Sequence, residues 1–256
     1  MENLTEIKQI IADAKNIYLV PSQGPEGSPE AITSVLALFY TLKELNKNVN
    51  LVLDSFPENL KFLAPSLDFI SYPKNFVVSI PSNVAKISQI YYEKNDDALK
   101  IHLTLESGNI KKDNISFYFS EAKPDLVITI GIKDYQKELS NKLDSFGFLL
   151  DSPILNIDTS SPLSTSNGQD DLTSSVQMNK KFGKINLIEG SSLTETIFAL
   201  IGGESIKKET ALCLLSGLMI YTGNFKNRLT AEIFQTAADL MKKGAELQTI
   251  TNSIKF

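Results

Sequence analysis

Polar residues follow several of the short apolar runs in this sequence, and their positions could support chemistry. Each is a hydroxyl residue, a carboxylate or a glycine at a point where a strand is expected to end or a helix to begin or end. They are Ser22, Ser28, Glu30, Gly131, Asp158, Thr159, Ser160, Tyr221 and Thr222. Carboxylate oxygens suit a hard cation such as magnesium or manganese, so Glu30 and Asp158 are the candidate metal ligands.

The sequence contains one histidine and one cysteine. His102 lies on the polar side of an alternating strand pattern, which predicts a solvated surface residue rather than a ligand. Without a suitably placed histidine, a Ser/His/Asp or Cys/His arrangement cannot form. Cys213 stands in an apolar run and is expected to be a buried small hydrophobe, since a lone thiol cannot form an internal disulfide or a cysteine-rich zinc site.

The elements that must position these residues alternate between strands and helices. Strands are expected at 17–20, 49–53, 125–130, 153–157 and 184–188, and helices at 3–14, 30–45, 192–201, 207–221, 230–243 and 246–254. A strand, a helix and a strand within about 40 residues form a right-handed βαβ unit. The sequence therefore predicts an α/β fold with a parallel sheet of about five strands flanked by helices. Ligands bind such a sheet beyond the carboxyl ends of its strands, where the candidate residues fall.

Residues 72–122 interrupt this pattern. Four strands are expected there, at 76–80, 84–93, 99–105 and 115–119, with almost no helix between them. Strict alternation over 99–105 indicates a strand with one face in water. We therefore expect an antiparallel β insertion within a single domain of residues 1–256. Its free strand edges would suit a homodimer formed by sheet extension.

Composition limits the classes of partner. The 256 residues are 42% hydrophobic and 21% charged, which is typical of a globular protein. A net charge of −5 opposes nucleic-acid binding through bulk positive charge. A polar N-terminus and the lack of an apolar run of about 20 residues indicate neither a signal peptide nor a membrane span, so a cytoplasmic location is expected. The polar stretch 158–182 is expected to be a long surface loop with a partial helix.

The order of the candidate motifs resembles that of the DHH phosphoesterase superfamily, over about residues 15–70 and 124–254. The family's first motif has two aspartates one residue apart at a helix start, where this chain has Ser28 and Glu30. The second motif ends a strand with an aspartate, where Gly131 stands. Asp158-Thr159-Ser160 takes the place of the Asp-His-His motif, and Tyr221-Thr222-Gly223 that of the final Asp-Thr-Gly. A family segment of small residues before a helix resembles residues 191–195.

The resemblance implies a two-metal phosphoesterase site, usually loaded with manganese, that lacks most of its ligands here. Two neighbouring dications need several converging anionic oxygens, and only Asp158 and the longer acid Glu30 could supply them. The family's glycine- and histidine-rich C-terminal substrate lobe is also expected to be absent, because the chain ends at Phe256. Our first hypothesis is therefore a degenerate, non-hydrolytic binding or scaffolding domain without a metal cofactor, able to take a nucleotide or phosphate ligand.

Two alternatives stay open. One is a phosphoesterase with an altered site, in which Glu30 and Asp158 share a manganese or magnesium ion and the substrate is a short oligonucleotide or a cyclic dinucleotide. The other is an oligomerisation or interaction protein that acts through the β insertion. Each motif residue also has a purely structural interpretation.

The structural interpretations concern helix and strand ends. Residues Ser28, Pro29 and Glu30 form a good helix start, with serine as the cap, proline at the first position and an acid in the first turn. Asp158 could cap the turn after its strand. Gly223 could end a helix in the left-handed conformation.

Overall fold

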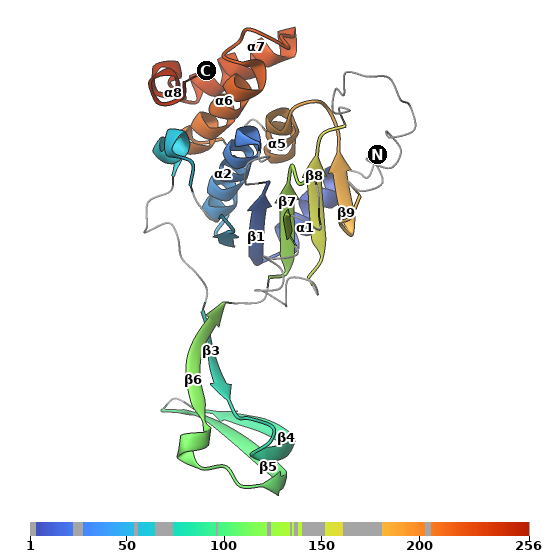
Figure 1. Ribbon diagram of the computed structural model, residues 1–256, viewed down its shortest axis with the longest axis vertical. Helices are drawn as coiled ribbons and strands as arrows, with labels where there is room; N and C mark the ends of the chain where they lie inside the picture. Colours follow the sequence, from blue (N-terminus) through green and yellow to red (C-terminus); the bar gives the residue numbers. More distant parts are fainter. Residues whose placement is uncertain are drawn as a thin grey trace. The chain divides into compact units, whose positions relative to one another are not determined.

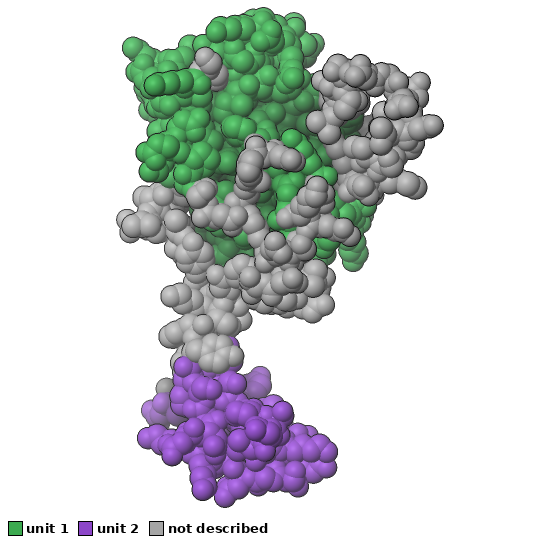
Figure 2. Space-filling model, viewed as in Figure 1, with its two compact units in different colours: residues 1–72, 123–256 green, residues 73–122 purple. Residues whose placement is uncertain are grey.

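The computed structural model describes residues 4–22, 28–53, 56–64, 74–95, 97–121, 124–133, 135, 138–139, 152–160, 181–202 and 206–255. The chain divides into two compact units (Figure 2). The α/β unit comprises residues 1–72 and 123–256, and the β unit comprises residues 73–122.

The α/β unit contains a five-stranded parallel sheet, as predicted (Figure 1). Its strands are β1 (Asn16–Pro21), β2 (Asn48–Leu51), β7 (Leu126–Ile130), β8 (Ile154–Asp158) and β9 (Ile185–Ile188). They lie in the order β2-β1-β7-β8-β9. Every residue of β7 and β8 is buried, which agrees with the mostly apolar sequence of β7, although β8 also buries Asn156 and Asp158.

Helices flank this sheet. They are α1 (Leu4–Asp13), α2 (Pro29–Glu44), α5 (Leu193–Ile201), α6 (Lys208–Thr222), α7 (Ala231–Lys242) and α8 (Leu247–Ser253), with a 3₁₀ helix η1 (Glu58–Leu63). The larger apolar cluster joins the six α-helices named above to alternate strand residues such as Ile17 and Leu19. The intervening residues Tyr18 and Val20 face a second cluster that includes Leu139, which is helical. No helix in the described part of the chain is long and apolar enough to cross a membrane.

Helix ends in this unit agree with the sequence in part. Ser28 is the N-cap residue of α2 and Pro29 opens the helix, as predicted, but the Ser28 side chain makes no capping hydrogen bond. The Ser28 carbonyl accepts the first backbone hydrogen bonds of the helix, from the N–H groups of Ala31 and Ile32. Gly223 ends α6 in the left-handed conformation, as predicted. Cys213 is buried, also as predicted, and burial raises the pKa of its thiol far above the ordinary value.

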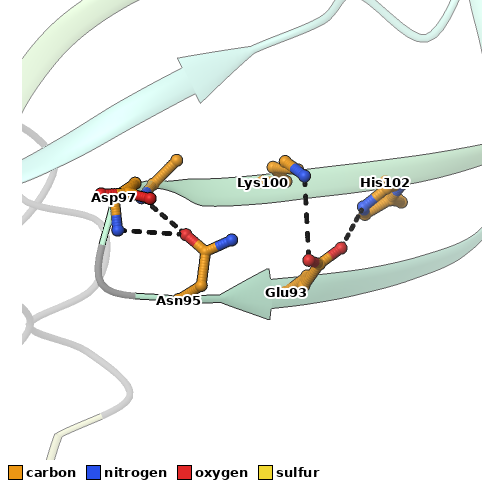
Figure 3. A network of polar contacts seen from close by, with 6 residues as sticks. Glu93, Asn95, Asp97, Lys100 and His102 are labelled. Carbon is orange, nitrogen blue, oxygen red and sulfur yellow. Dashed lines mark hydrogen bonds and ion pairs between the residues drawn. The ribbon is translucent and has the colours of Figure 1, made fainter.

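The β unit consists of antiparallel strand pairs, as predicted. Strand β3 (Lys74–Ser79) pairs with β6 (Ser116–Glu121), and β4 (Ala85–Lys94) pairs with β5 (Leu99–Gly108). A short 3₁₀ helix, η3 (Lys112–Asn114), precedes β6. The turn between β4 and β5 is held by the Oδ1 atom of Asn95, which accepts from the backbone N–H groups of Asp97 and Ala98 (Figure 3).

The prediction of a solvated His102 needs correction. His102 does lie on the polar face of β5, but its ring stacks on Tyr91 with centroids 4.5 Å apart and planes 3° apart. Its Nε2 atom is shielded from solvent and lies 3.7 Å from the Glu93 carboxylate. Cross-strand stacking therefore leaves this imidazole half-buried, an effect that the alternation of polar and apolar residues does not reveal.

Candidate functional site

The carboxyl ends of the parallel strands bring most of the candidate residues to one edge of the sheet. Backbone hydrogen bonds link the ends of neighbouring strands. Ser22 N–H donates to the Ile130 carbonyl, and Gly131 N–H donates to the Ile157 carbonyl. The direction in which successive strands are added to the sheet reverses between β1 and β7, since β2 lies on one side of β1 and the later strands lie on the other. Ser22 and Gly131 therefore stand at the switch point, where ligands bind in open parallel sheets.

Glu30, in the first turn of α2, points to the start of α5. Its buried Oε1 atom accepts hydrogen bonds from Ser192 Oγ at 2.7 Å and from Thr194 N–H at 3.0 Å. Ser192 also caps α5, where its oxygen accepts from Glu195 N–H at 3.2 Å. Burial raises the pKa of Glu30, and the hydrogen bonds from Ser192 and Thr194 oppose part of that rise. The carboxyl group thus joins two helix starts inside the protein.

Asp158, the last residue of β8, is also buried. Its Oδ1 atom accepts from the backbone N–H of Thr159 at 2.8 Å, which holds the turn that follows the strand. Next along the chain, Ser160 donates from both its backbone N–H and its Oγ to the carbonyl of Gly190, at 3.0 and 2.8 Å. The chain after β8 is therefore fastened to the loop after β9.

Gly131 directly follows β7, where the sequence resemblance would place an aspartate, and its backbone has a φ of +69°. A Cβ atom added there would lie 2.9 Å from Leu193 Cδ1 and 3.2 Å from Ala31 Cβ. Both neighbours are buried. A side chain at this position would need a left-handed backbone conformation and a shift of Leu193, so glycine suits both requirements.

Tyr221 and Thr222, at the end of α6, have different surroundings. The Tyr221 hydroxyl donates to Ser191 Oγ at 2.7 Å and so reaches the loop after β9. Thr222 is buried, with its hydroxyl donating to Leu218 O at 2.8 Å and accepting from Phe225 N–H at 3.0 Å. Thr222 therefore closes the helix end, and Tyr221 faces the edge where the other candidates gather.

Two charged residues at this edge were not predicted. Glu138 accepts from Ser22 Oγ at 2.6 Å and from Lys133 N–H at 2.9 Å, which ties the chain after β7 to the end of β1. Arg228 is the only arginine in the sequence. Its guanidinium carbon lies 5.0 Å from the ring centroid of Tyr221. The presence of a single arginine, five residues after Gly223, is the feature of the sequence that could have identified it.

The loop after β9 is the common contact of these groups. The Gly190 carbonyl accepts a hydrogen bond from Ser160, Ser191 Oγ accepts one from Tyr221, and Ser192 Oγ donates one to Glu30. The edge is therefore rich in hydroxyl groups rather than in clustered acids. Among the described residues, no group of three or more His, Cys, Asp or Glu side chains lies close enough together to hold a metal ion.

Comparison with known proteins gives a likeness of fold. No family model and no curated protein matches the chain. A solved structure with a similar fold is that of an exopolyphosphatase-related protein from Bacteroides fragilis, with a TM-score of 0.60 and 20% sequence identity. The match covers 98% of this chain and 59% of the other, so this chain spans about three-fifths of its neighbour. The chain therefore shares its fold with this exopolyphosphatase-related protein.

Proposed function

We propose that this chain is a catalytically degenerate, DHH-like phosphoesterase domain that binds a phosphate-bearing or nucleotide ligand, or acts as a scaffold, without hydrolysing it. The observation that carries the proposal is the placement of Glu30. Its Oε1 atom is buried and already accepts from Ser192 and Thr194. A carboxyl group committed to two internal donors contributes to helix packing and is a poor metal ligand.

Electrostatics supports the same proposal. Burial raises the pKa of Glu30, which favours its neutral form. A two-metal site needs the opposite, namely several ionised oxygens that offset the repulsion between the cations. Gly131 adds to this argument, because its left-handed backbone and the nearby Leu193 Cδ1 leave little space for an acidic side chain. At the same edge, Ser191 Oγ accepts from Tyr221 and keeps its own O–H as a neutral hydrogen-bond donor suited to a phosphate oxygen.

The first test is an activity assay. The full chain with manganese or magnesium is expected to show no turnover of pyrophosphate, short oligoribonucleotides or cyclic dinucleotides above that of an Asp158→Ala variant. Calorimetric titration with inorganic phosphate and with a mononucleotide tests the binding part. Metal-dependent turnover that disappears in the Asp158→Ala variant would overturn the proposal.

A second candidate function, a phosphoesterase with an altered metal site, is favoured by Asp158. This acid is buried at the end of β8, on the edge where parallel sheets bind ligands. A cation bound only by the folded state at about 100 times its Kd stabilises a protein by about 2.7 kcal/mol. In a chain of this size that corresponds to a rise in Tm of roughly 5–10 °C.

Thermal unfolding therefore separates the two functions. Under our first proposal, we expect manganese to leave the Tm of the wild-type chain and of the Asp158→Ala variant equally unchanged. A rise of several degrees that requires Asp158 would instead support the altered metal site.

A further inference from the structure

One face of the ribbon formed by β4 and β5 is apolar and exposed. The pairing places Ile90 opposite Leu103 and Tyr92 opposite Ile101. By alternation along the strands, the face comprises Ile90, Tyr92, Leu99, Ile101, Leu103 and Leu105, with Lys94 at its end. Five of these side chains are exposed by 37–75%, with Tyr92 the most exposed. We call this set, without Lys94, the apolar face.

The opposite face of the ribbon carries charges that neutralise one another. Glu93 lies 3.7 Å from Lys100 and 3.7 Å from His102 (Figure 3). Elsewhere on the same two strands, Lys86 pairs with Glu106 at 2.9 Å. Residues 73–122 contain six lysines, three aspartates and three glutamates, so their formal charge is zero and the net charge of −5 belongs to the rest of the chain.

We propose that the apolar face packs against the same face of a second copy of this chain, giving a two-layer sandwich of four strands. An isolated two-stranded ribbon is marginally stable in water, and a second layer would supply the missing apolar cover. At the observed exposures the face presents about 600 Å² of surface, since a large side chain buries roughly 200 Å². Two copies would bury about 1,200 Å², which is sufficient for a specific interface.

The charge distribution favours a second copy over other occupants. The apolar face has no charge across its centre, so it is complementary to itself and meets no like-charge repulsion in a symmetric contact. An anionic membrane or a nucleic acid would need a basic surface, and residues 73–122 have equal numbers of acids and lysines. Pairing through strand edges would leave the apolar face in water, whereas face-to-face packing covers it.

Sedimentation velocity of the full chain over about a hundredfold range of concentration would test this inference. The wild type is expected to dimerise. The double variant Tyr92→Lys/Ile101→Lys places two charges in the contact and should weaken dimerisation on the order of 100-fold or more. The matched control Gln89→Lys/Thr104→Lys adds the same charge to a facing pair on the other side of the ribbon and should change the dissociation constant by less than about threefold.

A variant without added charge tests whether weaker dimerisation comes from loss of the apolar contact or from unfolding of the ribbon itself. Threonine has a high strand propensity, so Tyr92→Thr/Ile101→Thr keeps the ribbon while removing apolar area, and it should also weaken the dimer, by roughly 30-fold. Three results would overturn the inference: a wild type that stays monomeric, a dimer that the neutral variant does not weaken, or capture of the wild type by phosphatidylcholine vesicles in place of dimerisation. None of these readouts depends on ligand binding or hydrolysis, so the inference is independent of the proposed function.

Discussion

Replacing Glu30 with alanine is expected to lower the free energy of unfolding by about 3 kcal/mol, because two buried donors would lose their acceptor. These donors are Ser192 Oγ and the backbone N–H of Thr194, at 2.7 and 3.0 Å from Glu30 Oε1. Glutamine keeps an amide oxygen at the same position, so Glu30→Gln should change the free energy by less than about 1 kcal/mol near neutral pH. Denaturant unfolding followed by circular dichroism would measure both values.

The same pair of variants gives a pH dependence of defined sign. Burial raises the pKa of Glu30 in the folded chain above its ordinary value of 4.5. Between those two pKa values the folded chain binds more protons than the unfolded chain, so stability falls as pH rises through that window. Glu30→Gln has no proton to lose, and its stability relative to the wild type should therefore increase as pH rises from 4.5. Parallel pH profiles for the two proteins would contradict this assignment.

Ser192→Ala supplies the control for this contact. It removes one donor to Glu30 and the side-chain cap of α5, and should lower the free energy of unfolding by about 1–2 kcal/mol. The double variant with Glu30→Ala should lose less free energy of unfolding than the two single variants lose together, because each single change already breaks the same hydrogen bond. Strict additivity would show that Glu30 and Ser192 act separately.

Much of the fold could be predicted from local patterns. The buried strands β7 and β8 are short apolar runs between turn residues, and the apolar spacing over α2 is helical, so their types and approximate bounds follow from periodicity. The parallel arrangement follows from the strand-helix-strand succession. The order of the strands within the sheet depends on pairing between distant segments, and no local pattern in the sequence reports it.

The site was harder to predict because its contacts join segments far apart in the chain. Glu30 was considered as a metal ligand, but its direction is set by Ser192 and Thr194, more than 160 residues later. Ser28 is the N-cap residue of α2, as its position before Pro29 predicts, but its hydroxyl makes no capping hydrogen bond, and no local pattern in the sequence reports this. Glu138 contributes through a hydrogen bond to Ser22, which has no sequence pattern of its own.

The residues at the positions that resemble the family's motifs have a common physical property. Glu30 is turned inward to α5, Gly131 leaves little room for a side chain, and Tyr221 carries a neutral hydroxyl. Under the proposed function, an aspartate introduced at one of these positions would leave the others unsuited to a metal. We expect Gly131→Asp alone to destabilise the chain without producing metal-dependent activity.

Replacing Gly217 with valine is expected to lower the free energy of unfolding by more than about 3 kcal/mol. Gly217 lies in α6, and an added Cβ would stand 2.4 Å from Thr194 Oγ1 and 2.6 Å from Thr33 Oγ1. Both threonines are fully buried, so α2 and α5 cannot move aside locally. Even Gly217→Ala should cost about 2 kcal/mol, although alanine favours a helix over glycine by about 1 kcal/mol.

A rescue experiment tests whether this close approach is the cause. Thr33 Oγ1 donates to the Glu30 carbonyl at 3.0 Å, so crowding at residue 217 also presses on the turn that positions Glu30. In a Thr33→Ala/Thr194→Ala background both opposing oxygens are gone, and Gly217→Ala should then become nearly neutral. Ser216→Ala, the adjacent substitution in α6, serves as the control and should cost less than about 1 kcal/mol, since the Ser216 hydroxyl bonds only within its own helix to Leu212 O. A full penalty for Gly217→Ala in the rescue background would mean that the glycine is required for backbone flexibility and that the three helices do not depend on this contact.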